Sequence, residues 1–171
     1  DRIFLEKNKT EENKNLDLEE ILKLEPPQDK EKLGFVKHDN EDGVYLGEAD
    51  YATPQGRGSY VFKNDGQSWI GYFENGEKGK YGQFYDKDGR LTYEGEYSHG
   101  ERNGKGKYYY PNGSIYEGDF VRNKKEGNGV FHWDDKTRWE GTWVNDKMDG
   151  PGTYYEGEDS VPLTYSQGNV V

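Results

Sequence analysis

From Tyr45 onward the sequence repeats about every 23 residues, and this periodicity limits the possible folds more than any other feature of the chain. Each of five copies begins with an aromatic residue: Tyr45, Trp69, Tyr93, Tyr116 and Trp139. A glycine follows two residues later, and four of the five copies then carry a Gly-x-Gly triplet. Short units of this kind contact mainly their neighbours, so we expect a repeat array rather than a fold around one thick core.

Within a copy, aromatic residues and glycines occupy alternate positions. Tyr93, Gly95 and Tyr97 alternate with charged residues, and the second half of the copy alternates in the same way from Gly104 to Tyr110. A period of two residues is typical of a β-strand with one aromatic face. Two strands of about five or six residues account for each copy, so the sequence predicts a continuous antiparallel meander.

Turns are predicted from Asn-Gly and Asp-Gly pairs, which tolerate the positive φ of tight hairpins. These pairs fall between copies, at 64–66, 88–89 and 112–113. Within a copy we expect a longer charged loop, such as 98–103. The glycines have a second predicted role: each lets a neighbouring ring lie flat over bare backbone, where a methyl group would displace it.

Composition narrows the possible functions. Only 30% of the 171 residues are hydrophobic, but 15% are Phe, Trp or Tyr, so the apolar surface consists mainly of rings. The net charge of −11 argues against nucleic-acid binding, because phosphate contacts need clustered Lys and Arg. The chain has no cysteine for a disulfide or a thiolate zinc site, and no run of 18 apolar residues that could span a membrane.

Residues 1–32 differ sharply from the repeats in composition and contain no glycine. One face of a predicted short helix carries three apolar residues, Leu18, Ile21 and Leu22. Asp17 can cap this helix, and the proline pair at 26–27 ends it. Because such a short helix is marginal alone, it needs a surface. Two alternatives remain open: it covers the last strand or an aromatic groove of its own sheet, or it reaches another protein.

The sequence therefore predicts an all-β fold, namely an elongated, single-layer, twisted antiparallel sheet of repeated hairpins with a short N-terminal helical arm. We divide the chain into the arm (1–32), a leading cap strand (33–44), five repeats (45–160) and a degenerate closing strand with a tail (161–171).

The units resemble the membrane occupation and recognition nexus (MORN) repeat. The resemblance is carried by Tyr-x-Gly-Glu-Tyr at 93–97, Tyr-x-Gly-Asp-Phe at 116–120 and Trp-x-Gly-Thr-Trp at 139–143, each followed by its Gly-x-Gly. It covers roughly residues 45–156 and implies a twisted antiparallel sheet used mainly as a protein-interaction scaffold, with members in ciliary axonemes, cytoskeletons, membrane junctions and some enzymes. The second copy departs from the pattern at Lys80 and Asp86, where we expect the sheet to bend or to be contacted.

No catalytic, cofactor or metal site is expected. His38, His99 and His132 lie far apart in different copies or turns. The Gly-x-Gly pairs recur at the repeat period and lack the full phosphate-loop pattern, which indicates structural glycines. Carboxylates such as Glu48 and Glu96 recur at one position off the aromatic face, where a solvated or cross-strand role is expected rather than a hydrolase pair. We therefore expect that the protein is not an enzyme.

Two surfaces are candidates for binding. The first is the aromatic face, because the repeat supplies no second layer to cover it, and a partner helix laid in this groove is the leading mechanism. Its candidate residues, with those of the arm, are Tyr93, Tyr97, Tyr116, Phe120, Trp139, Trp143, Leu18, Ile21 and Leu22. The second is a row of cations in the long loops, facing anionic lipid: Lys78, Lys80, Arg102, Lys105, Lys124, Lys125 and Lys147. Interleaved acids weaken the attraction of this row to a membrane surface.

By analogy with the family, we expect a non-catalytic scaffold or connector that binds protein partners as a subunit of a larger complex. The expected location is cytoplasmic, in a cytoskeletal or ciliary (axonemal) assembly. One alternative is a peripheral membrane module that binds anionic lipid at a junction. The other is a regulatory domain of a larger enzyme, which the start at Asp1 rather than Met keeps open.

Overall fold

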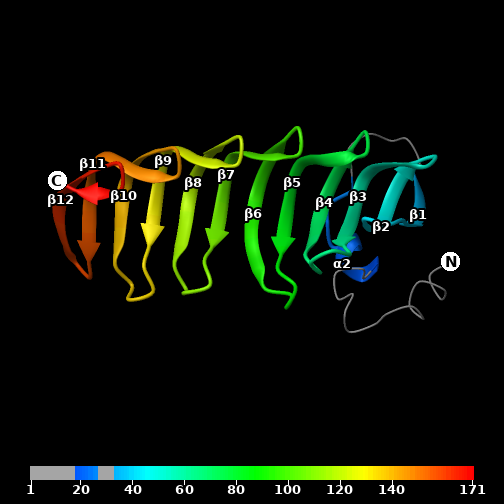
Figure 1. Ribbon diagram of the computed structural model, residues 1–171, viewed down its shortest axis with the longest axis horizontal. Helices are drawn as coiled ribbons and strands as arrows, with labels where there is room; N and C mark the ends of the chain where they lie inside the picture. The colour runs from blue at the N-terminus through cyan, green and yellow to red at the C-terminus, as the bar shows by residue number, and fades with distance from the viewer. Residues whose placement is uncertain (1–17, 27–32) are drawn as a thin grey trace. The chain divides into compact units, whose positions relative to one another are not determined.

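The computed structural model describes residues 18–26 and 33–171. In this part of the chain one helix, α2 (Leu18–Leu22), precedes an open antiparallel sheet of thirteen strands in chain order (Figure 1). The predicted all-β fold of repeated hairpins with a short N-terminal helix is therefore confirmed. Asp17, the predicted helix cap, lies outside the described residues.

Contacts divide the chain into two compact units. The first runs to Thr92 and includes 98–100, and the second comprises 93–97 and 101–171. The first unit contains α2 and the strands β1 (Gly34–Asp39), β2 (Gly43–Asp50), β3 (Thr53–Phe62), β4 (Ser68–Glu74) and β5 (Glu77–Tyr85). Strand β6 (Leu91–Ser98) has residues in both units. The second unit continues with β7 (Glu101–Tyr109), β8 (Ile115–Val121), β9 (Lys124–His132), β10 (Arg138–Val144), β11 (Lys147–Glu156), β12 (Asp159–Ser166) and β13 (Asn169–Val170).

The two kinds of turn are the reverse of the sequence prediction. Within a copy the strands are joined by two residues with positive φ, such as Asn145 (48°) and Asp146 (70°). Between copies the connection is longer, and an Asp or Asn side chain closes it, as Asp65 does by accepting the N–H of Gln67 at 2.9 Å. The expected long loop at 98–103 was wrong, because its charged residues from Glu101 onward continue as strand β7.

The strand pairs within copies share one irregularity. In the β2–β3 pair the register shifts between Gly47 and Ala49, so that Glu48 alone faces three residues of β3. The same shift recurs in β4–β5, β8–β9 and β10–β11. Three acids at this position satisfy the displaced backbone: the carboxylates of Glu48, Glu96 and Asp119 accept the N–H groups of Arg57, Lys105 and Asn128 at 2.7, 3.0 and 3.0 Å. These recurring carboxylates therefore have a structural role.

The first ring of each copy lies over two glycines. A Cβ added at Gly95 or Gly106 would overlap the ring of Tyr93, whose phenol donates a hydrogen bond to the backbone carbonyl of Glu96 at 2.9 Å. The equivalent stacks are Tyr45 over Gly47 and Gly58, Trp69 over Gly71 and Gly82, Tyr116 over Gly118 and Gly129, and Trp139 over Gly141 and Gly152. The predicted packing of flat rings on bare backbone is confirmed.

Within each unit, rings of the same copy and of successive copies also meet edge to face. The centroid of Tyr116 lies 5.2 Å from that of Phe120 and 4.8 Å from that of Trp143, at interplanar angles of 88° and 79°. In the first unit Tyr45 meets Phe73 at 4.9 Å and 80°. Burial raises the pKa of the Tyr116 phenol, as expected for a ring enclosed by other rings. These contacts form a thin aromatic core on one face of the sheet.

Replacing Gly106 or Gly129 with alanine should lower the free energy of unfolding by about 1–3 kcal/mol, because the new methyl group must displace Tyr93 or Tyr116. Chemical denaturation of each variant measures the effect. Gly34→Ala is the matched control, since a Cβ at Gly34 meets nothing within 4 Å. Unchanged unfolding midpoints in both test variants would contradict the packing role of these glycines.

Candidate functional site

The aromatic residues that were predicted to bind a partner are buried by the chain itself. Their exposed fractions are 0% for Tyr116 and Trp139, 1% for Tyr93, 2% for Phe120, 3% for Trp143 and 7% for Tyr97. The expectation that these rings form an uncovered face was wrong, because stacking on glycine and edge-to-face contacts use their surfaces inside the fold. A binding surface must be sought on the other face of the sheet.

The cations that were predicted to face lipid lie in strands β5, β7, β9 and β11 rather than in long loops. Three of them cover rings: Lys78 lies 5.4 Å from the centroid of Phe84, Arg102 5.3 Å from that of Tyr108, and Lys125 5.0 Å from that of Trp143. Lys80 lies over Tyr72, and Lys105 forms an ion pair with Asp119. Lys124 and Lys147 remain exposed. Most of the predicted row therefore has contacts inside the fold.

On the face opposite the rings, the first unit has a row of backbone flanked by two walls of side chains. This glycine row crosses the strands through the paired residues Gly47, Gly58, Gly71 and Gly82. The first wall, on one side of the row, consists of Leu46, Ser59, Ile70 and Gln83. The second wall, on the other side, includes Glu48, Arg57 and Tyr72.

Helix α2 is held against the first wall. Ile21 is fully buried and packs against Leu46 and Ile70, with Leu24 and Tyr85 partly buried alongside. A helix of five residues is not stable in isolation, so this apolar cluster is what holds it in place. The arm therefore covers its own sheet, but on the face opposite the rings.

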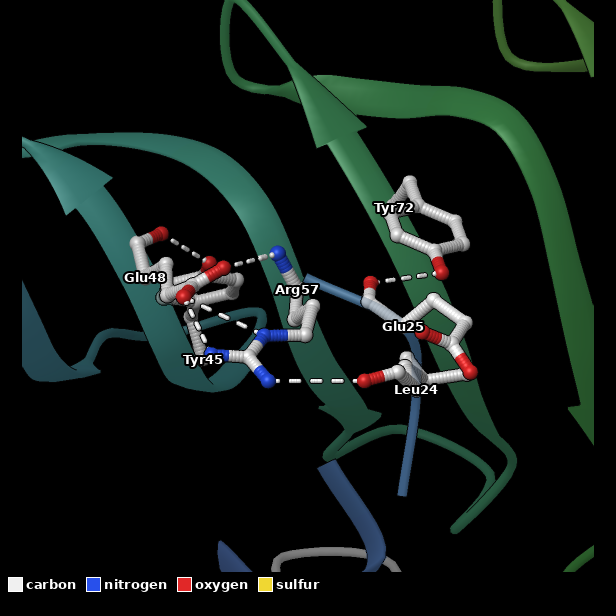
Figure 2. Close-up of polar contacts among 6 residues, drawn as sticks. All are labelled: Leu24, Glu25, Tyr45, Glu48, Arg57 and Tyr72. Carbon is white, nitrogen blue, oxygen red and sulfur yellow. Dashed lines mark hydrogen bonds and ion pairs between the residues drawn. The ribbon is translucent and has the colours of Figure 1, made fainter. Parts of the chain in front are cut away.

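The second wall binds the chain just after the helix (Figure 2). Arg57 donates from a terminal guanidinium nitrogen to the carbonyl of Leu24 at 3.4 Å, and the phenol of Tyr72 donates to the carbonyl of Glu25 at 2.8 Å. Glu48 holds the Arg57 guanidinium at 2.7 Å, and the side chains of Glu48 and Arg57 are only 8% and 12% exposed. Burial raises the pKa of the Tyr72 phenol further above its ordinary value near 10, at which a phenol is already a donor at neutral pH. The arm thus contacts both walls across the glycine row.

The arm docks on the irregular second copy. Tyr72 stands where three other copies have an acid, and Lys80 stands where all four have a glycine with positive φ. In the third copy Gly104 has a φ of 101°, a region that favours glycine, and a Cβ there would also overlap the Glu96 carboxylate. Lys80 is not among the residues with positive φ, and its ammonium lies 5.4 Å from the Tyr72 ring. The arm contacts this copy at Tyr72, whose phenol donates to Glu25, whereas the sequence prediction named Lys80 and Asp86 and stays a prediction for those two positions.

The three predicted arm residues differ in their environment. Ile21 is buried, Leu18 is half-buried, and Leu22 is 42% exposed. The first wall was missed, although the sequence contains a signal for it. The second residue of each copy is Leu46, Ile70, Glu94, Glu117 and Glu140, so two apolar residues are followed by three acids. That change marks where the sheet is covered by an apolar segment.

The described residues give no support for a metal centre, since no cluster of three or more His, Asp or Glu side chains with suitable geometry occurs among them. The three histidines lie in different elements, His38 in β1, His99 in a turn and His132 in β9. Over the same residues, no helix has the length and apolar character needed to cross a membrane.

Ile21→Ala should release the arm from the sheet, because deleting a buried isoleucine side chain to alanine costs about 2–5 kcal/mol. Amide exchange in residues 18–25 should then become fast, while the strands of the second unit keep their protection. Leu22→Ala is the control, since Leu22 is 42% exposed. If both variants keep the arm equally protected, the cluster around Ile21 does not hold it.

Comparison with known proteins identifies the repeat. Residues 93–115, 116–138 and 139–158 each match the MORN repeat, and these are the three copies on which the resemblance rests most directly. No curated protein was found to match the chain. The copies that begin at Tyr45 and Trp69 have the same ring-over-glycine stacks as the three matched copies. Residues 93–158 of the chain are therefore three consecutive MORN repeats.

Proposed function

We propose that the protein is a non-catalytic connector that holds a protein partner within a larger assembly. The observation that carries the proposal is the docking of α2, in which a short apolar segment crosses the glycine row and is bound by both walls. MORN repeats are in general modules for protein or membrane interaction, so the mode of docking and the family agree on the type of role.

The contacts of the docked arm indicate the chemistry that we propose for this role. Its apolar contact is made by Ile21, whereas its polar contacts are made by the backbone carbonyls of Leu24 and Glu25. Carbonyls near a helix C-terminus lack intrahelical partners, so any segment that ends a helix over the second wall can use them. Recognition of this kind needs a matching apolar residue and a helix end. It needs no aromatic groove. We therefore propose this mode of binding in place of the partner helix in an aromatic groove that the sequence led us to expect.

We place this function in the cytoplasm, in a cytoskeletal or ciliary assembly. The support is the resemblance of the repeats to those of axonemal and cytoskeletal MORN proteins. The alternatives are a lipid-binding junctional module, favoured by the exposed Lys124 and Lys147, and a regulatory domain of a larger enzyme.

Affinity purification of the full chain from its native organism, followed by mass spectrometry, tests the connector role. We expect stoichiometric recovery of structural proteins of the cytoskeleton or the axoneme. Recovery of one enzyme at fixed stoichiometry would instead favour a regulatory role, and recovery of no partner would contradict the proposal.

Vesicle cosedimentation separates the connector from the membrane module. At physiological salt we expect no binding to vesicles of phosphatidylserine or phosphatidylinositol phosphates, because the net charge of −11 repels anionic lipid and most cations are engaged within the fold. Lys124→Glu with Lys147→Glu is the matched variant. Binding that this double variant abolishes would establish the membrane alternative.

A further inference from the structure

The second unit also has a glycine row, at the repeat positions equivalent to those of the first unit. Its glycine row passes through the paired residues Gly106, Gly118, Gly129 and Gly141. A groove of about 820 Å³ lies over this row, and no aromatic side chain lines it. Besides Gly95, its lining includes Glu94, Lys107, Glu117, Val130 and Glu140 on one side of the row and Lys105 and Asn128 on the other. The groove is therefore on the face opposite the rings, as is the site of α2 in the first unit.

The walls of this groove differ in chemistry from those of the first unit. Where Leu46 and Ile70 contact Ile21, the second unit carries three acids, Glu94, Glu117 and Glu140. None of these acids is buried. An apolar segment such as α2 does not fit this wall, because it would bury carboxylates without adequate partners.

Each of the three acids already has a hydrogen-bond donor or a cation nearby, but its carboxylate can accept further hydrogen bonds. The phenol of Tyr109 donates to Glu94 at 2.7 Å, Arg138 lies 3.0 Å from Glu140, and the ammonium of Lys107 is 3.9 Å from Glu117. Each contact leaves carboxylate lone pairs for a further donor, since an ionised carboxylate offers about four acceptor sites. The acids can therefore accept hydrogen bonds from cations of a partner.

The spacing of the acids specifies the partner. Glu117 and Glu140 both pair with Val130 of β9, so they stand two strands apart on one line across the sheet. Two strand spacings amount to roughly 9.6 Å. Seven residues of an α-helix rise about 10.5 Å. A helix laid along the glycine row with a basic residue at every seventh position therefore presents one cation to each acid, and flexible Lys or Arg side chains absorb the small mismatch.

We propose that this groove binds a basic amphipathic helix of a partner protein, with Lys or Arg at heptad spacing against Glu94, Glu117 and Glu140 and small residues against the glycine row. This proposal rests on the connector role and names the chemistry of the partner. The net charge of −11 favours the encounter with a basic segment.

A designed peptide tests the proposal on the full chain. The probe is a fluorescent helical peptide of three heptads with Lys at every seventh position and Ala on the face toward the groove, and its binding is measured by anisotropy. The triple variant Glu94→Gln, Glu117→Gln, Glu140→Gln should weaken binding by about tenfold or more, because each exposed ion pair contributes a fraction of a kcal/mol. The control variant Asp134→Asn, Glu156→Gln, Glu158→Gln makes the same change in net charge at exposed positions outside the groove and should stay within about twofold of the parent chain.

A peptide and a protein variant with reversed charges serve as a control for unfolding of the variants. A peptide with Glu in place of the three Lys residues should bind the variant Glu94→Lys, Glu117→Lys, Glu140→Lys and not the parent chain. Equal binding of the Lys peptide to the parent and to the triple Gln variant, or failure to bind the parent, would overturn the proposal. A homodimer that the triple Gln variant dissociates would identify a second copy as the occupant and would also overturn it.

The same variants separate this inference from the connector role. In affinity purification, a partner recovered equally by the parent chain and the triple Gln variant would overturn the basic-helix site and leave the connector role standing. Recovery of no partner by the parent, the triple Gln variant or the control variant would overturn the connector role itself.

Discussion

The fold depends on the contact between an aromatic ring and the bare backbone of two glycines. An open sheet has no second layer, so its apolar face must be covered by its own side chains. The Tyr93 ring lies flat over Gly95 and Gly106 and so covers two strands at once, and its phenol donates a hydrogen bond to the backbone carbonyl of Glu96, three residues later. Glycine weakens a strand by its conformational freedom, and the large area of the ring offsets that loss.

This contact determines where the other unusual residues lie. The shift in register that follows the covered glycine leaves displaced N–H groups, and the acids Glu48, Glu96 and Asp119 accept them. The cations that follow lie over the next rings, as Lys125 lies over Trp143. Features that resemble phosphate loops, acid pairs or a basic patch in the sequence are therefore parts of one repeated packing solution.

The sequence was sufficient to predict the strands, their antiparallel meander and the ring-over-glycine stacks, because a period of two residues and the spacing of glycines are local signals. It was not sufficient to predict the turn lengths, since residues 101–103 have loop composition but continue a strand after a two-residue turn. It also placed Tyr116 and Trp139 on an open face. Their burial arises from contacts between copies, such as the contact of Tyr116 with Trp143, which no single copy reveals.

The two faces of the sheet are constrained differently, and this difference bears on function. On the ring face every copy must satisfy the same stacking geometry, so its residues can vary little without loss of packing. On the opposite face the second position of a copy takes no part in the ring-over-glycine stack, and it varies between Leu46, Ile70 and Glu117. An apolar residue there requires a cover, which the arm supplies in the first unit through Ile21. An acid there excludes that cover, because a carboxylate buried without a partner costs several kcal/mol. One position in the repeat therefore decides whether a stretch of sheet binds the chain's own arm or remains available for a segment of opposite charge.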